Sequence, residues 1–216
     1  MKGLLAFSVF LPALFFGCNA LAQRSSSFAV VVSPALFVPV SVAVQGGVQL
    51  KAGKKWQILT EAAFPAFYPK NTEYEEIKYW RTGLEVKYFI KGKSSSIRYF
   101  SLQNNYLFRE LKDADQSFYY TRTQTFSYTN AVIQSPVLSS AFKMGVELPA
   151  GKRTFVDAFI GAGLRFIFTE YQAKTVLLTS TEPPKQNVLK FDDAWKNNYT
   201  LMRLHATAGM RFGYRL

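Results

Sequence analysis

His205 is the one histidine in the 216-residue chain and the first residue to consider for proton transfer. A histidine within hydrogen-bond reach of a serine or an aspartate can act as a general base in acyl transfer. The sequence does not place such a partner beside His205, which alternates with apolar residues in the last segment of the chain. We therefore expect His205 to belong to a polar interior network and the protein to be no enzyme. The alternative is a lipid-modifying enzyme.

Two other groups are weaker candidates for chemistry. Asp192 and Asp193 lie side by side in a polar segment, but two carboxylates are too few for a divalent-cation site. Cys18 is the single cysteine, and the stretch Phe15–Cys18 resembles a lipoprotein cleavage site. We expect cleavage beyond Cys18 instead, which leaves the mature chain without a thiolate nucleophile or a disulfide. No metal or other cofactor is expected.

The N-terminal stretch has the three parts of a secretory signal peptide. They are the basic Lys2, the apolar residues Leu4–Gly17 and the small-residue cleavage site Ala20–Leu21–Ala22. The apolar run is shorter than the roughly 20 residues that a membrane-spanning helix needs. We expect a signal peptide at residues 1–22 that directs export through the Sec pathway, followed by one domain at residues 23–216.

The larger chemical feature is a set of charged residues at the polar positions of segments that alternate between polar and apolar. If these segments form one closed sheet, four acidic and eight basic side chains face its interior: Glu61, Arg81, Glu85, Lys87, Arg109, Lys143, Glu147, Asp157, Arg165, Arg203, Arg211 and Arg215. An eight-stranded barrel is just wide enough for side chains, and buried charges must be paired. We expect a structural plug that includes His205, with the excess bases near the wet ends. An ion-conducting pore is the alternative.

The elements that position these residues are β-strands. Met202–Leu216 alternates between apolar and polar residues without a break, which indicates a strand of roughly 50 Å, long enough to cross the ~25 Å apolar band of an outer membrane even when tilted. The same alternation predicts seven further strands: Phe28–Phe37, Val40–Leu50, Trp56–Phe67, Tyr79–Ile90, Ile97–Arg109, Val137–Leu148 and Thr154–Tyr171.

The connections alternate between short and long. Short turns carry glycine and basic residues, whereas the longer segments are Tyr68–Lys78, Glu110–Gln134 and Gln172–Asn198. We expect Glu110–Gln134 to extend strands beyond the membrane and Gln172–Asn198 to form a loop. The pattern is typical of an all-β, eight-stranded antiparallel up-and-down transmembrane β-barrel, with short periplasmic turns and longer outer loops.

Alternation alone does not decide which face points outward, and a secreted lipocalin-like binder of apolar ligands would turn its apolar face inward. Long strands and charges on the polar faces favour the apolar face outward. Aromatic residues then form girdles at the two membrane interfaces: Trp56, Tyr88, Phe212 and Tyr214 at one, and Phe64, Trp80, Phe108, Phe166 and Phe168 at the other.

The architecture resembles the small OmpA/OmpX-type eight-stranded barrels over the mature chain. The turn Leu50–Trp56 also resembles the G-K-K-W turn of an uncharacterised outer-membrane barrel family, a domain of unknown function. The last strand is similar to the C-terminal assembly signal of outer-membrane barrels. These resemblances imply a fold and a location in the bacterial outer membrane, and no activity.

The expected function is therefore that of a non-enzymatic outer-membrane β-barrel that presents outer loops for surface interaction or cell-envelope integrity. Its partners would be outer-membrane lipids, the assembly machinery that reads the last strand and an unidentified extracellular ligand. The net charge of +12 would suit nucleic acid in a soluble protein, but export and dispersed charges argue against that partner. We expect a monomer.

Overall fold

The computed structural model describes residues 28–37, 41–65, 76–90, 97–113, 117–120, 124–174, 176–180 and 197–216. Twelve strands lie in these ranges: β1 Phe28–Phe37, β2 Ser41–Lys51, β3 Trp56–Pro65, β4 Glu76–Ile90, β5 Ile97–Asp113, β6 Ser117–Tyr120, β7 Thr125–Tyr128, β8 Asn130–Gln134, β9 Val137–Pro149, β10 Thr154–Lys174, β11 Leu177–Ser180 and β12 Tyr199–Arg215. The expected signal peptide, Cys18, Asp192 and Asp193 lie outside the described residues.

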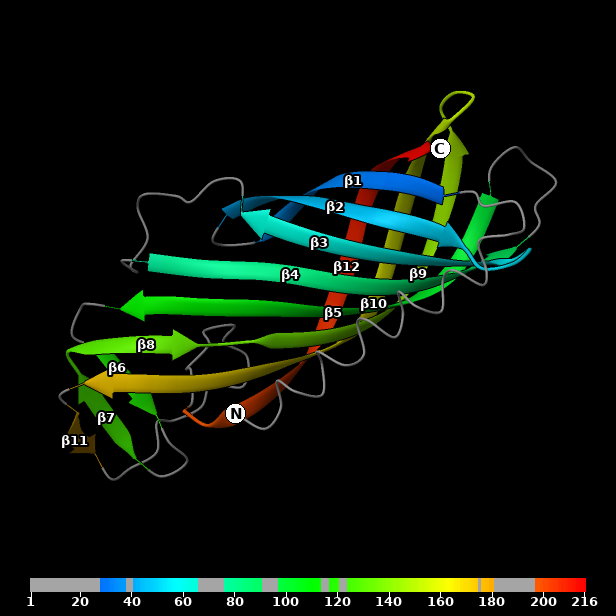
Figure 1. Cartoon of the computed structure of the whole chain (residues 1–216). Coiled ribbons are helices and arrows are strands. Elements are labelled where there is room, and N and C mark those ends of the chain that lie inside the picture. The colour runs from blue at the N-terminus through cyan, green and yellow to red at the C-terminus, as the bar shows by residue number, and fades with distance from the viewer. Residues whose placement is uncertain are drawn as a thin grey trace.

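Eight of the strands form a closed antiparallel ring (Figure 1). The hydrogen-bonded order is β1, β2, β3, β4, β5, β9, β10 and β12, and β12 returns to β1. Each ring strand pairs with the next ring strand along the chain, so the prediction of eight antiparallel strands in sequential order is confirmed. β8 lies in line with β9 between β5 and β10, and Pro136 separates the two segments.

The strands of the ring are strongly staggered. If the paired residues are followed once around the ring, Gly213 on β12 pairs with Val31, and the same path returns to β12 at Arg203, ten residues away. A stagger of this size in eight strands corresponds to a tilt of about 40° and a backbone diameter of ~16 Å. This diameter leaves room for interior side chains.

The long connections contain more strand than the sequence predicts. β4 begins at Glu76 inside the predicted loop Tyr68–Lys78, and β10 continues to Lys174. The prediction of a loop over Gln172–Asn198 is wrong in part, because Leu177–Ser180 forms β11, which pairs with β7. Backbone groups that continue past the ring need partners, and neighbouring strands supply them.

The extension predicted over Glu110–Gln134 is present as the end of β5 and as β6, β7 and β8. A three-stranded sheet of β11, β7 and β6 lies at one end of the ring, and the C-terminus lies at the other (Figure 1). We call the end with this sheet the outer end and the opposite end the turn end, because the short turns after β2 and β9 lie there.

The apolar face of the strands points away from the ring interior. Along β12 and the residue after it, the even residues from Met202 to Leu216 are exposed and the odd ones are buried or half-buried. Ile160 is 60% exposed and Phe142 55%, although both lie in the middle of ring strands. The inward apolar face of a lipocalin-like binder is therefore not found. Among the described residues, no helix is long and apolar enough to cross a membrane.

Candidate functional site

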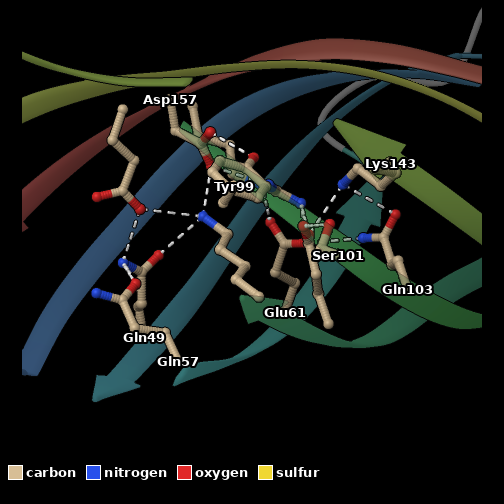
Figure 2. A network of polar contacts seen from close by, with 12 residues as sticks. Gln49, Gln57, Glu61, Tyr99, Ser101, Gln103, Lys143 and Asp157 are labelled. Carbon is tan, nitrogen blue, oxygen red and sulfur yellow. Dashed lines mark hydrogen bonds and ion pairs between the residues drawn. The ribbon is translucent and has the colours of Figure 1, made fainter. Parts of the chain in front are cut away.

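The interior near the turn end holds a network of ion pairs that joins five of the eight ring strands (Figure 2). Lys87 of β4 lies at its centre. The Lys87 Nζ is 2.7 Å from Asp157 Oδ2 of β10 and 3.2 Å from Glu147 Oε1 of β9. It also donates to Gln49 Oε1 of β2 at 3.2 Å. Both acids and Lys87 are almost completely buried.

Arg211 of β12 binds three carboxylates at once. Its Nε and Nη2 donate to the two oxygens of Glu61, each at 2.8 Å. Nη2 also lies 2.6 Å from Glu85 Oε2, and Nη1 lies 3.1 Å from Asp157 Oδ2. A bidentate guanidinium–carboxylate pair is among the strongest protein hydrogen-bond arrangements. Arg211 therefore ties β3, β4 and β10 to β12.

A third cation, Lys143 of β9, completes the pairing of Glu85. Its Nζ is 2.9 Å from Glu85 Oε2 and donates to Gln103 Oε1 at 3.3 Å. Ser101 Oγ donates to the other oxygen of Glu85 at 2.6 Å. Lys143 and Arg211 also lie over the ring of Phe159, at 3.5 and 4.3 Å from its centroid, where the aromatic face attracts cations.

These contacts fill the interior at this level. Glu85, Lys87, Lys143 and Asp157 have no exposed surface, and Arg211 is 1% exposed. Each described interior carboxylate has at least one cation partner, and Glu147 has a second in Arg215 at 3.3 Å. Buried charges persist when paired and hydrogen-bonded. The arrangement is that of a plug that braces the ring.

Tyr99, an aromatic residue of the network, packs directly against Gly145. Tyr99 donates from its hydroxyl to Asp157 Oδ1 at 2.6 Å, and its ring covers Gly145 so closely that an added Cβ would lie 2.2 Å from the ring. Lys87 Nζ lies 4.5 Å from the centroid of the same ring. The missing side chain at Gly145 thus gives Tyr99 the room to orient Asp157 toward Lys87.

We expect Gly145→Ala to lower the free energy of unfolding by about 1–3 kcal/mol, because the methyl group overpacks the interior and displaces Tyr99. Equilibrium unfolding in urea measures this change. The matched control is Gly46→Ala, where an added Cβ meets no atom within 4 Å. Equal stability of the two variants would contradict the role assigned to Tyr99.

The other predicted interior residues lie toward the outer end. Arg165 on β10 pairs with Arg203 on β12. Two residues closer to the turn end, Gly163 pairs with His205. Arg81 donates to Gln45 Oε1, and Arg109 Nη2 donates to Ser135 Oγ at 2.9 Å. Among the described residues, no hydrogen bond joins His205 to a serine or an acid. The pairing that an acyl hydrolase needs is thus absent from that part of the chain.

The predicted girdle residues lie on the outer surface. Trp56, Phe212 and Tyr214 are 49%, 54% and 43% exposed near the turn end, and Trp80 is 38% exposed nearer the outer end. The rings of Trp56 and Tyr88 lie 4.9 Å apart, and those of Trp80 and Phe108 lie 5.8 Å apart. Each end of the apolar surface thus carries paired aromatic side chains.

The outer end carries an aromatic cap, which consists of Tyr119, Phe126, Tyr128 and Tyr171. The Tyr119 ring centroid is 5.2 Å from those of Phe126 and Tyr171 and 6.0 Å from that of Tyr128. The cap packs with Tyr79, Leu111 and other residues of the ring. Burial raises the pKa of the Tyr119 hydroxyl.

Sequence reasoning missed the uncharged members of the network. Gln49, Tyr99, Ser101, Gln103 and Phe159 all contact the charged groups. The alternation within each strand already puts Gln49, Tyr99, Ser101 and Gln103 on the polar face, but it does not show that they contact the charges. Phe159 has the parity of Asp157 on β10, which could have identified it as an inward residue. No group of three or more potential metal ligands occurs among the described residues.

The protein is all-β: eight antiparallel strands form a closed ring, with paired charges inside and apolar side chains outside. Its chain belongs to a family described as protein of unknown function (DUF3575), whose model matches residues 10–190. The expectation of a family of unknown function is confirmed, and the G-K-K-W turn at residues 53–56 lies within the matched range.

A structural similarity was found to a major outer membrane protein from the bacterium Thermus thermophilus. The two chains are 12% identical, the match covers 89% of this chain and all of the other, and the TM-score is 0.48. No curated protein matches the sequence.

Proposed function

We propose that this protein is an integral β-barrel of the bacterial outer membrane, without enzymatic activity, that presents its outer end for surface interaction or cell-envelope integrity. The observation that carries the proposal is the polarity of the ring. Paired charges lie in the interior beside buried Val31, Leu59 and Phe155. By contrast, Ile160, Phe142, Met210 and Leu204 are at least half exposed on the exterior. Soluble monomers rarely expose apolar patches larger than a few hundred Å², but lipid solvates such a surface.

The spacing of the aromatic pairs agrees with this placement. Tyr88 and Trp80 lie eight residues apart on β4 and share its outward parity, Trp80 being 38% exposed and Tyr88 half-buried. That separation is about 26 Å along the strand and roughly 20 Å along the ring axis at a tilt of 40°. The apolar band of an outer-membrane barrel is about 25 Å tall and has aromatic girdles at both edges. Trp56 and Tyr88 would then lie at the periplasmic edge.

The interior contacts support a scaffold and not a channel. The network around Lys87 and Arg211 leaves these side chains buried, and the aromatic cap packs against residues of β2, β4, β5 and β8 at the outer end. Outer-membrane lipids are thus the main partners that we propose. The assembly machinery would read β12, and any extracellular ligand would meet the sheet of β6, β7 and β11. The proposed barrel acts as a monomer, since a closed ring has no free edge among its eight strands.

The mobility of the protein in gel electrophoresis tests this proposal. Protein extracted from outer membranes with detergent is expected to migrate faster without boiling than after boiling, because a folded barrel stays compact in detergent. Recovery of the protein in the soluble periplasmic fraction, with no difference between boiled and unboiled samples, would refute the membrane placement.

A further inference from the structure

The turn end of the ring presents positive charge on its surface. Its exposed cations are Lys51, Lys54, Lys55, Arg98, Lys152 and Arg153. The interior carboxylates are buried and already form ion pairs with Lys87, Lys143, Arg211 and Arg215. The other acidic residues that the structure describes lie at the outer end by their register: Glu76, Glu110, Asp113 and Glu170. The described surface of the turn end is therefore basic, and it suits an anionic partner.

Two of these cations lie on either side of Tyr88, at the edge of the apolar surface. Lys55 comes directly before β3, and its Nζ donates to the Tyr88 hydroxyl at 3.2 Å and lies 5.5 Å from the centroid of the Tyr88 ring. Tyr88 on β4 pairs with Phe100 on β5, so Arg98 lies diagonally opposite Tyr88. Such diagonal neighbours are about 7–8 Å apart, which long side chains can bridge. We call Lys55, Tyr88 and Arg98 the rim site.

An apolar strip continues from the rim site toward the middle of the ring. The outward residues that follow Arg98 on β5 are Phe100 and Leu102, and both are exposed. The Phe100 ring stacks on that of Phe142 on the neighbouring strand β9, with the centroids 5.6 Å apart. Charge and apolar surface thus follow each other along one strand, as the phosphate group and the acyl chains do in a phospholipid.

The three side chains of the rim site supply the hydrogen-bond donors that a phosphate group needs. An ammonium group has three donors and a guanidinium group has five, and both form charge-assisted hydrogen bonds with phosphate oxygens. The Tyr88 hydroxyl accepts from Lys55 and can donate its own hydrogen to the same phosphate. A zwitterionic headgroup carries an ammonium group that Lys55 and Arg98 repel. The site therefore favours a headgroup with net negative charge.

We propose that the rim site binds the phosphate group of an anionic phospholipid in the periplasmic leaflet, whose acyl chains lie along Phe100 and Leu102. Lys55 and Arg98 are its charged ligands, and Tyr88 orients Lys55. This inference rests on the proposed membrane placement and adds the class of lipid and the residues that select it. A single cation at an anionic membrane surface strengthens binding roughly fivefold, so two cations give a measurable selectivity.

The test measures which lipid lies beside Trp56, whose ring centroid is 4.9 Å from that of Tyr88. Trp80→Phe and Trp195→Phe leave Trp56 as the one tryptophan of the full mature chain, which is refolded into vesicles of phosphatidylglycerol and phosphatidylcholine. One of the two lipids carries bromine in its acyl chains, and bromine quenches a tryptophan that it contacts. We expect phosphatidylglycerol to bind beside Trp56 at least about tenfold more tightly than phosphatidylcholine.

The double variant Lys55→Gln and Arg98→Gln is expected to lower this ratio at least about fivefold. The matched control is Lys54→Gln with Lys152→Gln, which removes the same charge from exposed turn positions outside the rim site. Water and salt screen those positions, so the control should lower the ratio less than about twofold. Tyr88→Phe keeps both cations and removes the hydroxyl, so its ratio should lie between those of the two double variants.

Equal binding of the two lipids in the unaltered rim site would overturn the proposal. Equal losses in the two double variants would do so as well, because selectivity would then follow total charge and not the rim site. If the variant with Lys55→Gln and Arg98→Gln does not fold, each single change should still lower the ratio more than Lys54→Gln does. Inorganic phosphate should lower the ratio no more than sodium chloride at the same ionic strength, and a larger effect would assign the site to a free phosphate ion.

The same measurement separates this proposal from the membrane placement. If neither brominated lipid quenches Trp56, the residue does not contact lipid and the placement itself is refuted. If both lipids quench Trp56 to the same extent, the placement is supported and only the rim site is refuted.

Discussion

Arg211→Gln is expected to lower the free energy of unfolding by about 3–5 kcal/mol, because it leaves buried carboxylates without their shared cation. Glu61 loses a bidentate partner, and Glu85 and Asp157 each lose an ion pair. Glutamine retains two donors but no charge, so it cannot balance three carboxylates whose side chains are at most 3% exposed. Equilibrium unfolding in urea, followed by tryptophan fluorescence in lipid vesicles, measures the change.

Arg215→Gln is the matched control for this variant. Arg215 lies four residues along the same strand, is 34% exposed at its side chain and has one ion pair, with Glu147 at 3.3 Å. Solvent screens such a pair, so its loss should cost about 1 kcal/mol or less. Equal losses of unfolding free energy in the two variants would show that the specific contacts of Arg211 with its three carboxylates add nothing beyond the loss of one positive charge.

Ile160→Arg is expected to cost about 2–4 kcal/mol in a lipid bilayer, because it places a charge at the middle of the surface that we propose to face lipid. Ile160 lies on β10 and is 60% exposed, and Ala208 and Met144 are its partners in the register. In a soluble protein, a charged residue at so exposed a position would be harmless. Unfolding in vesicles measures the cost.

Leu177→Arg provides the comparison, since Leu177 is 64% exposed but lies on β11 in the small sheet at the outer end. Water surrounds that sheet in the proposed orientation, so this variant should retain the stability of the unaltered protein. A similar effect at both positions would argue against a lipid-facing band around Ile160, whatever the result with detergent extracts.

The parity of each strand could be predicted from sequence because side chains in a strand alternate strictly between two faces. Met202 and Arg203 could therefore be assigned to opposite faces from the sequence alone, and the structure places them so. The same reasoning assigned Glu61, Glu85 and Asp157 to the interior. These assignments depend only on the position of a residue within its own strand, and a short stretch of sequence is enough to give that position.

The partners of these residues could not be predicted, because pairing across the interior depends on the stagger of the whole ring. Glu61 and Arg211 are 150 residues apart, and a shift of two residues in any hairpin would keep both inside but move Arg211 to another level. The prediction for Gln172–Asn198 failed for a related reason. The four residues of β11 have no alternating pattern, and their strand partner in the structure is β7.

The ring closes at its shortest pairing. β1 and β12 share four register pairs, Ala29 to Val32 with Arg215 to Phe212, whereas β10 and β12 share sixteen. A chain that adds hairpins in order would join these two strands last, and a ring under stress would unzip there first. Arg211 lies next to the final pair and forms ion pairs with carboxylates on three other strands. These ion pairs therefore hold β12 in the ring at the place where it has the fewest backbone hydrogen bonds to its neighbour.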